Sequence, residues 1–460
     1  MNKNCYEHRL TIATLVGIFS GGLIGAVLKN FTEQPWTERA IMFFQFPGDV
    51  FLRTVNMLII PLVVSSIVSA SCNLSKSGTI GLKALYYYTA TTTLGITLSV
   101  ILSQTIRPGE IHRNDNSTIA GGSKNFIATD IFLDLFRNLF TDNIVTACVS
   151  QYQTFLIEPS NASSDDGDSI YFWKISSRET DGTNILGLVM WSLLLGIAIG
   201  HIGNRGKPLL HFFDSLSGVM MMTMDKVTQL APFGVLFLVP GKILETDDIG
   251  AMLTRLGVYV MTVFLGLIIH GLVVLPTLYF VCTRKSPFKI LAKVGPAFVT
   301  ACGTSSSTAT VPMTLKCLDR IGVDRKVSRF VVPLGATINM DGIALYETIG
   351  AMFIIQLRGL DISLIKVIAI SITCTVSCIG AAGLPNGGYM MLILVLNSIG
   401  IPASDVMLII TIDCLVDRFR TTVNIVADSL GAGVISHLTR NEEALERLDE
   451  TTVPLNSVLL

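Results

Sequence analysis

A series of apolar runs, each too long for a water-soluble core, is the strongest constraint on how this chain can fold. Spans at 183–202 and 250–282 contain "ILGLVMWSLLLGIAIG" and "YVMTVFLGLIIHGLVVLPTLYFVC". A helix needs about 20 apolar residues to cross a hydrocarbon core about 30 Å thick. Half of the 460 residues are hydrophobic and only 15% are charged, whereas soluble domains carry about 25% charged residues. The sequence therefore predicts an all-α, polytopic membrane protein, and its net charge of −1 argues against a nucleic-acid partner.

The charges between the spans predict the orientation of the chain. Further apolar spans fall at 9–29, 41–71, 79–106 and 208–241. Alternate joints carry the basic residues Lys76, Lys83, Arg205, Lys207, Arg284, Lys285, Lys289 and Lys293. The positive-inside rule places these joints and both termini in the cytoplasm. Segment 107–180 then lies outside, its sequons at Asn116 and Asn161 are predicted glycosylation sites, and residues 129–152 predict a broken or interfacial helix.

After residue 284 the spans are interrupted by small and polar residues. An interrupted hairpin at 288–317 precedes a polar-centred span at 326–357, and a second hairpin at 362–396 precedes a charged span at 402–435. Irregular backbone at membrane depth is tolerated only where protein or an aqueous cavity surrounds it. Paired discontinuous segments are the sequence pattern of a secondary transporter, whose binding site they form.

The last span carries a stripe of polar residues inside an apolar helix. Asp413, Asp417, Arg420, Asn424 and Asp428 are separated by 4, 3, 4 and 4 residues and share one helical face. The three acids and one base leave a local charge of −2. Negative charge in a low-dielectric setting must bind cations or protons. We therefore interpret the stripe as a binding site rather than a solvated surface.

Three further motifs place polar groups at interruptions of the hydrophobic pattern. "SSST" (305–308) and "GLPNGG" (383–388) lie at the hairpin tips, where free backbone N–H groups suit a carboxylate. "NMDG" (339–342) predicts an unwound helix whose oxygens bind Na⁺. Glu347 is either a lone intramembrane acid bonded to a neighbour or a carrier of a proton or counter-cation.

Four stretches carry a resemblance to a known family: "SSSTATVPMTLKCL", "GATINMDGIALYE", "GAAGLPNGG" and "DRFRTTVNIVADSLGAG". They resemble the glutamate (excitatory amino acid) transporters of the dicarboxylate/amino acid:cation symporter family, solute carrier family 1, over about residues 9–440. The resemblance implies eight transmembrane helices plus two re-entrant helical hairpins in an inverted-repeat elevator fold. It also implies a homotrimer in the plasma membrane that contacts lipid and conducts Cl⁻. The chain is not expected to be an enzyme, and no catalytic residue is predicted.

The resemblance also implies a division of the chain into moving and fixed parts. Residues 1–78 form scaffold, and residues 79–107 form the third span, in the transport domain. Residues 108–247 contain the extracellular insertion and two scaffold spans. Residues 248–440 form the transport-domain core, and residues 441–460 form a cytoplasmic tail.

Site roles follow from the same resemblance. Asp417 binds the substrate amino group and Arg420 binds the side-chain carboxylate. The substrate set is Ser305, Ser307, Ile343, Leu384, Gly388, Asp417, Arg420, Thr421 and Asn424. The sodium set is Tyr88, Thr91, Thr92, Gly335, Thr337, Asn339, Asp341, Cys378, Ile379, Ala381, Asn424 and Asp428. Glu347 implies coupling to H⁺ and K⁺.

One departure from the family pattern leaves the substrate open. Ile343 stands where the animal glutamate transporters have Thr, which removes a hydroxyl donor worth about 1.5–3 kcal/mol toward a charged group. The second tip reads "PNGG" where "PQAG" is usual. Aspartate, glutamate and D-aspartate are the expected substrates. The alternatives are neutral amino acid exchange, a sulfonate substrate such as taurine or cysteate, or mainly a substrate-gated anion channel.

Overall fold

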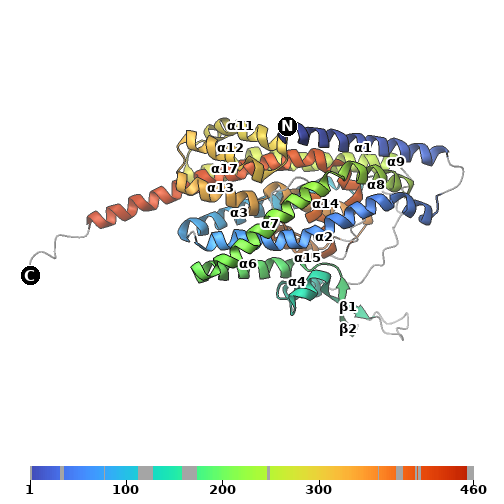
Figure 1. Cartoon of the computed structure of the whole chain (residues 1–460), viewed down its shortest axis with the longest axis horizontal. Coiled ribbons are helices and arrows are strands. Elements are labelled where there is room, and N and C mark those ends of the chain that lie inside the picture. Colours follow the sequence, from blue (N-terminus) through green and yellow to red (C-terminus); the bar gives the residue numbers. More distant parts are fainter. Residues whose placement is uncertain are drawn as a thin grey trace, which may run out of the picture.

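Helices along the long axis of the molecule form almost all of the described structure (Figure 1). The computed structural model describes residues 3–31, 36–76, 78–111, 128–157, 174–245, 249–360, 362–379, 387–398, 401 and 406–452. The first half contributes α1 (Lys3–Phe31), α2 (Glu38–Lys76), α3 (Gly78–Ile106), α6 (Ile185–Ile202), the 3-10 turn η2 (Gly203–Gly206), α7 (Lys207–Thr228) and α8 (Ala231–Glu245). Pro232 stands in the first turn of α8, where a missing N–H costs nothing, and this explains why the 208–241 span divides there.

The second half is a series of shorter helices that ends in one long helix. It contains α9 (Ile249–Ile269), the π-helical turn η3 (His270–Val274), α10 (Leu275–Thr283), α11 (Phe288–Thr304), α12 (Ser307–Ile321), α13 (Arg325–Ile338), α14 (Asp341–Arg358), α15 (Leu364–Ile379), α16 (Gly387–Ser398) and α17 (Met407–Thr452). α17 runs through the bundle and projects from one end of it (Figure 1).

Two of these helix pairs meet at the interruptions that the sequence predicts. α11 and α12 pack as a hairpin that turns at Ser305 and Ser306, and Ser305 has a left-handed φ of 50°. α13 and α14 are separated by Asn339 and Met340, which leave the helical conformation. α15 and α16 flank residues 380–386, which lie outside the described residues.

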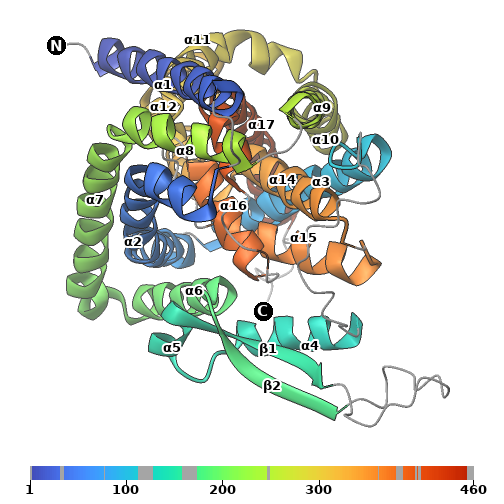
Figure 2. The same cartoon turned by 90° about the vertical axis from the view of Figure 1, so that its right-hand side faces the viewer.

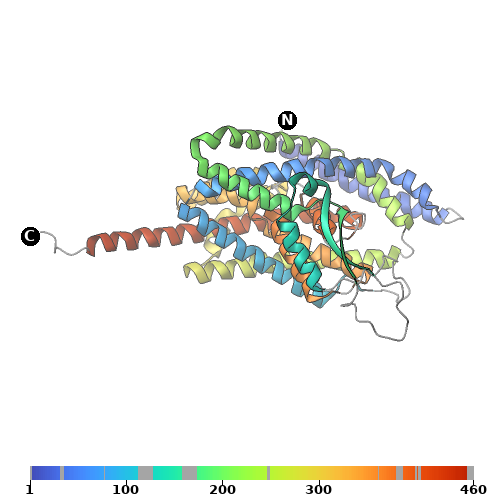
Figure 3. The same ribbon diagram turned by 90° about the horizontal axis from the view of Figure 1, so that it is seen from below.

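The segment between α3 and α6 departs from the all-α expectation. α4 (Ala128–Leu139) and α5 (Ile144–Val149) confirm the broken helix, but a strand begins at residue 150. β1 (Ser150–Ile157) pairs antiparallel with β2 (Lys174–Asp181). The Asn138 side chain of α4 bonds both backbone groups of Tyr152 at 2.9 Å, which ties β1 to α4. Figure 3 shows this helix and the strands side by side in teal. The predicted glycosylation sites Asn116 and Asn161 lie outside the described residues.

The helices pack in two sets. α2 packs against α6, α7 and α8, and α1 packs against α8. The second set has α14 and α17 at its centre and also contains α3, α9 to α13, α15 and α16. Figure 2 shows this set beside the first. The boundaries between a fixed scaffold and a moving domain stay a prediction, as do the elevator motion and the number of spans.

Six segments among the described residues are long and apolar enough to cross a membrane. They are Ile12–Phe31, Glu38–Cys72, Gly78–Ile106, Leu186–Thr228, Gly250–Thr283 and Arg325–Arg358. In the last of these, residues 338–356 are all buried within the protein, whereas Arg325, Lys326 and Arg329 near its start are exposed. The break between α13 and α14 is therefore enclosed by other helices, as an irregular backbone at membrane depth requires.

Candidate substrate and cation site

The polar stripe of α17 faces the interior of the helix bundle. Asp413, Asp417, Arg420, Asn424 and Asp428 are each no more than 2% exposed. The sequence spacing therefore predicted the face correctly. Since none of these groups reaches water, each must be compensated by neighbouring protein groups or by a bound ligand.

The Arg420 guanidinium is the central cation of this stripe. It is 0% exposed, and its two terminal nitrogens form ion pairs with Asp413 at 2.8 Å and Asp417 at 2.6 Å. Its Cζ also lies 4.2 Å from the ring centroid of Tyr346, close enough for a cation–π interaction. Asp413 and Tyr346 thus join the site. The sequence placed Asp413 on the polar stripe, outside the predicted substrate set, and gave no role to Tyr346.

The second hairpin closes directly on this guanidinium. A Cβ at Gly388 of α16 would lie 1.8 Å from an Arg420 nitrogen, so this close approach requires glycine. Thr421 is buried and donates from its hydroxyl to the Asp417 carbonyl at 2.8 Å. Leu384, another predicted substrate residue, lies outside the described residues.

The tip of the first hairpin is attached to α17 by Arg418. This side chain donates to the Cys302 carbonyl at 2.7 Å, near the end of α11. Ser306 caps α12 by accepting a hydrogen bond from the Ala309 N–H at 3.2 Å, and Ser307 is 2% exposed. The predicted substrate residues Ser305 and Ser307 therefore lie at a turn that α17 holds in place.

The N-terminus of α14 also contacts α17. The Gly342 N–H donates to the Asn424 side-chain oxygen at 2.8 Å, and the Asn424 amide lies 3.3 Å from the Met340 sulfur. Ile343, the unusual residue, follows Gly342 and is 4% exposed. The structure thus brings Asn424 and the break in α13–α14 together.

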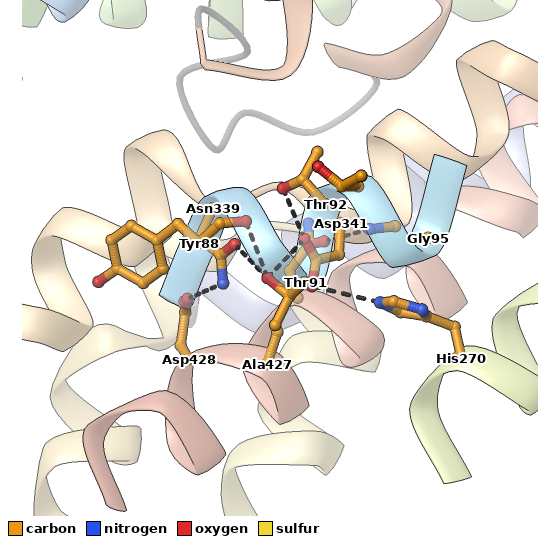
Figure 4. A network of polar contacts seen from close by, with 12 residues as sticks. Tyr88, Thr91, Thr92, Gly95, His270, Asn339, Asp341, Ala427 and Asp428 are labelled. Carbon is orange, nitrogen blue, oxygen red and sulfur yellow. Dashed lines mark hydrogen bonds and ion pairs between the residues drawn. The ribbon is translucent and has the colours of Figure 1, made fainter. Parts of the chain in front are cut away.

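A cluster of oxygen atoms surrounds Asp341 (Figure 4). The Thr91 hydroxyl lies 3.1 Å from the Tyr88 carbonyl, 3.1 Å from the Asn339 side-chain oxygen and 3.2 Å from Asp341 Oδ1. The Thr92 hydroxyl donates to Asp341 Oδ1 at 2.9 Å. A single Thr91 hydrogen cannot satisfy three acceptors. This surplus of oxygen lone pairs fits a hard cation such as Na⁺, which takes oxygen ligands.

A second group of oxygens surrounds Asp428. Its Oδ1 accepts from the Asn339 amide at 3.3 Å, and its Oδ2 is buried without a hydrogen-bond partner among the described residues. Gly335 of α13 lies directly against this carboxylate. Asn339 therefore links the group around Asp428 to the cluster around Asp341, and the orphaned oxygen is suited to a cation.

Other predicted residues lie apart from these oxygen groups or outside the described chain. The Tyr88 hydroxyl points away and donates to the Val331 carbonyl at 2.7 Å, so only its backbone oxygen joins the cluster. Thr337 lines a cavity of about 420 Å³ between α2, α7 and α13. Cys378 and Ile379 end α15. Ala381 lies outside the described residues.

Glu347 lies in the middle of the buried helix α14. Its side chain is 0% exposed, and neither carboxylate oxygen has a hydrogen-bond partner among the described residues. Both interpretations of Glu347, an acid bonded to a neighbour and a carrier of a proton or counter-cation, therefore stay predictions. A buried carboxyl without a partner must be neutral or must bind a cation.

His270 is a further polar residue, besides Tyr346, to which the sequence interpretation gave no role. It is 0% exposed, and its Nε2 lies 3.3 Å from Asp341 Oδ2 (Figure 4). A lone histidine in an apolar run gives no local signal of such a contact, because its partner is 71 residues away.

Comparison with known proteins identifies the family. The model of the sodium:dicarboxylate symporter family matches residues 9–438. The chain belongs to the sodium:dicarboxylate symporter family. This family membership and the apolar helices make the chain a multi-pass membrane transporter, not an enzyme.

Relatives of this symporter match along nearly its whole length. Excitatory amino acid transporter 3 of Mus musculus is 39% identical over 96% of this chain and 87% of its own length. Excitatory amino acid transporter 1 of Ambystoma tigrinum is 39% identical over 93% of this chain and 83% of its own length. Excitatory amino acid transporter 2 of Mus musculus is 38% identical over 95% of this chain and 80% of its own length.

The buried ion pairs lead to a stability prediction. Arg420→Met leaves two buried carboxylates without their cation, and breaking a buried pair costs about 3–5 kcal/mol. We expect its thermal midpoint in detergent to fall by several degrees. Adding Asp413→Asn to Arg420→Met removes one of the stranded charges and restores part of the loss.

The matched control is Arg53→Met, which breaks the exposed Arg53–Asp49 pair and costs about 0–1 kcal/mol. A double variant no more stable than Arg420→Met alone contradicts this account of the electrostatics.

Proposed function

We propose that this symporter carries acidic amino acids (L-aspartate, L-glutamate and D-aspartate) into the cell, driven by Na⁺. The observation that carries the proposal is the fully buried Arg420 guanidinium, which lies between two carboxylates and directly beneath Gly388 of α16. The names of the relatives support the substrate class.

The guanidinium explains selectivity for a second acidic group. An arginine presents a planar fork of N–H donors that matches a carboxylate in two hydrogen bonds. The substrate's side-chain carboxylate replaces one of the two protein carboxylates now paired with Arg420. Asp417 is then available for the substrate amino group. Asn424, Thr421 and the tip at Ser305 and Ser307 surround the α-carboxylate.

Sodium is assigned to the two oxygen groups. One group contains Asp428, Asn424, Asn339 and Gly335. The other contains Asp341, Asn339, Thr91 and Thr92. The Tyr88 carbonyl contributes to the second. Thr337, Cys378, Ile379 and Ala381 are assigned to a further sodium, for which the resemblance is the support. Substrate and sodium are coupled through two residues. Asn424, assigned to the substrate, accepts from the Gly342 N–H next to Asp341, and Asn339 links the Asp341 and Asp428 groups.

The remaining properties follow the family resemblance. Glu347 carries a proton inward and gives way to K⁺ on the return, and chloride passes without stoichiometric coupling. The protein is a homotrimer of eight spans and two hairpins in the plasma membrane, with both termini cytoplasmic and glycans on Asn116 and Asn161. The transport domain moves as an elevator.

Ile343 favours the shorter substrate. It is buried one residue after Gly342, whose Cα lies against the Arg420 backbone. An isoleucine here offers no hydroxyl to the substrate and adds bulk. We therefore place aspartate ahead of glutamate, with a sulfonate such as cysteate as the second candidate.

The transport test uses purified protein in liposomes with an inward Na⁺ gradient. Wild type accumulates radiolabelled aspartate. In Arg420→Cys, aspartate uptake falls at least about a hundredfold, as expected when about 3 kcal/mol of charge-assisted hydrogen bonding is lost, whereas serine uptake appears. Arg53→Cys, at an exposed ion pair, keeps wild-type uptake.

Unchanged aspartate uptake in Arg420→Cys refutes the assignment of this residue. If wild type gives a substrate-gated current without accumulation of label, the protein is mainly an anion channel. Accumulation of serine by wild type in preference to aspartate identifies a neutral amino acid exchanger.

A second transport prediction concerns Glu347. Net aspartate uptake by wild type requires internal K⁺, because the buried carboxylate needs a cation in order to return without substrate. Glu347→Gln removes the charge, so we expect Na⁺-dependent aspartate exchange to persist while the response to internal K⁺ disappears. Full K⁺ dependence in Glu347→Gln contradicts the role of this residue.

A further inference from the structure

His270 is a fully buried polar residue that the proposed transport scheme leaves without a role. Its Nε2 lies 3.3 Å from Asp341 Oδ2, and both side chains are 0% exposed. Its other ring nitrogen, Nδ1, is buried without a hydrogen-bond partner among the described residues. Burying a polar ring costs free energy unless a hydrogen bond compensates for the lost contact with water. The contact with Asp341 is therefore the feature that needs an explanation.

His270 begins a local irregularity of the backbone, the π-helical turn η3. η3 interrupts the helix formed by α9 and α10, and the Leu275 N–H bonds to the His270 carbonyl five residues earlier. Pro276 follows and has no N–H to continue the regular ladder. Single π turns of this kind occur frequently at functional sites. Gly95 of α3 lies against the His270 ring (Figure 4).

The Asp341 carboxylate is held differently on its two sides. Thr91 and Thr92 of α3 contact Oδ1 at 3.2 Å and 2.9 Å, whereas His270 contacts Oδ2 at 3.3 Å. A carboxylate oxygen accepts, so the histidine Nε2 is the donor. The two sets of contacts fix the plane of the carboxylate. Oδ1 stays within the cluster of oxygens that also contains Asn339.

We propose that His270 is a positioning residue for the Na⁺ site at Asp341. It donates from Nε2 to Oδ2, and it keeps Oδ1 turned toward the hydroxyls of α3. The inference rests on the proposed function, in which Asp341 holds sodium. Hydrogen-bond partners behind a metal ligand typically contribute about 10–100-fold in metal affinity.

Three variants separate the hydrogen bond from the packing. His270→Leu removes the donor and keeps an apolar side chain of moderate size. His270→Gln places an amide N–H near the position of Nε2. His270→Asn carries the same amide on a shorter side chain that does not reach Asp341. His201→Leu is the control, because His201 is exposed on α6.

Two readouts are measured for each variant. The first is the Na⁺ concentration that gives half of the maximal thermal stabilisation of purified protein without substrate. The second is the Na⁺ concentration for half-maximal aspartate uptake, together with the aspartate KM at saturating Na⁺. We expect His270→Leu and His270→Asn to raise both Na⁺ values about 10-fold or more, with the aspartate KM at saturating Na⁺ within about threefold of wild type. His270→Gln stays within about threefold of wild type in both.

The outcomes distinguish this inference from the proposed function. If wild type responds to Na⁺ and His270→Leu responds equally, the positioning role is refuted while the transport function stands. If wild type shows no response to Na⁺, the proposed function fails and this inference fails with it. Where His270→Leu does not fold, the comparison of His270→Gln with His270→Asn decides, and equal Na⁺ values for these two refute the role.

Discussion

The buried guanidinium of Arg420 is the interaction on which the rest of the site depends. A charge at the centre of a bilayer costs about 2.5–3.5 kcal/mol on insertion scales, and this one is 0% exposed. Its cost is offset by ion pairs with Asp413 and Asp417 and by the ring of Tyr346. These groups lie on α14 and α17, and Gly388 of α16 also lies against the guanidinium, so the three helices converge at this point. The convergence keeps these groups buried, and under the proposed function it selects a substrate carboxylate that can replace one of the protein carboxylates.

The same convergence explains why the helices are broken. Where α13 ends and α14 begins, the backbone meets side chains of α17: the Gly342 N–H donates to Asn424, and Gly335 packs closely against the Asp428 carboxylate. At the first hairpin, Arg418 holds the Cys302 carbonyl. At each break, backbone groups contact side chains of α17, the helix that carries the charged stripe. The result is a set of oxygen atoms with more lone pairs than donors, as a transported cation needs.

Much of this site could be predicted from the sequence, because helical spacing fixes a shared face. The stripe from Asp413 to Asp428 and the break at "NMDG" are local patterns, and both are present. The contacts between helices could not be predicted in the same way. The Tyr88 hydroxyl points to Val331 rather than into the site, and His270 meets Asp341 across 71 residues. The strands β1 and β2 lie in a polar segment whose alternation is too weak to distinguish a strand from a loop.

The central claim is that Arg420 exchanges a protein carboxylate for a substrate carboxylate. The most direct measurement is an experimental structure of the purified protein with Na⁺ and L-aspartate. The account predicts the aspartate side-chain carboxylate within hydrogen-bond distance of the Arg420 guanidinium, beneath α16 and the Ser305–Ser307 turn, with at least one of the Arg420 ion pairs broken. Aspartate bound elsewhere, with both Asp413 and Asp417 still paired to Arg420, would contradict it.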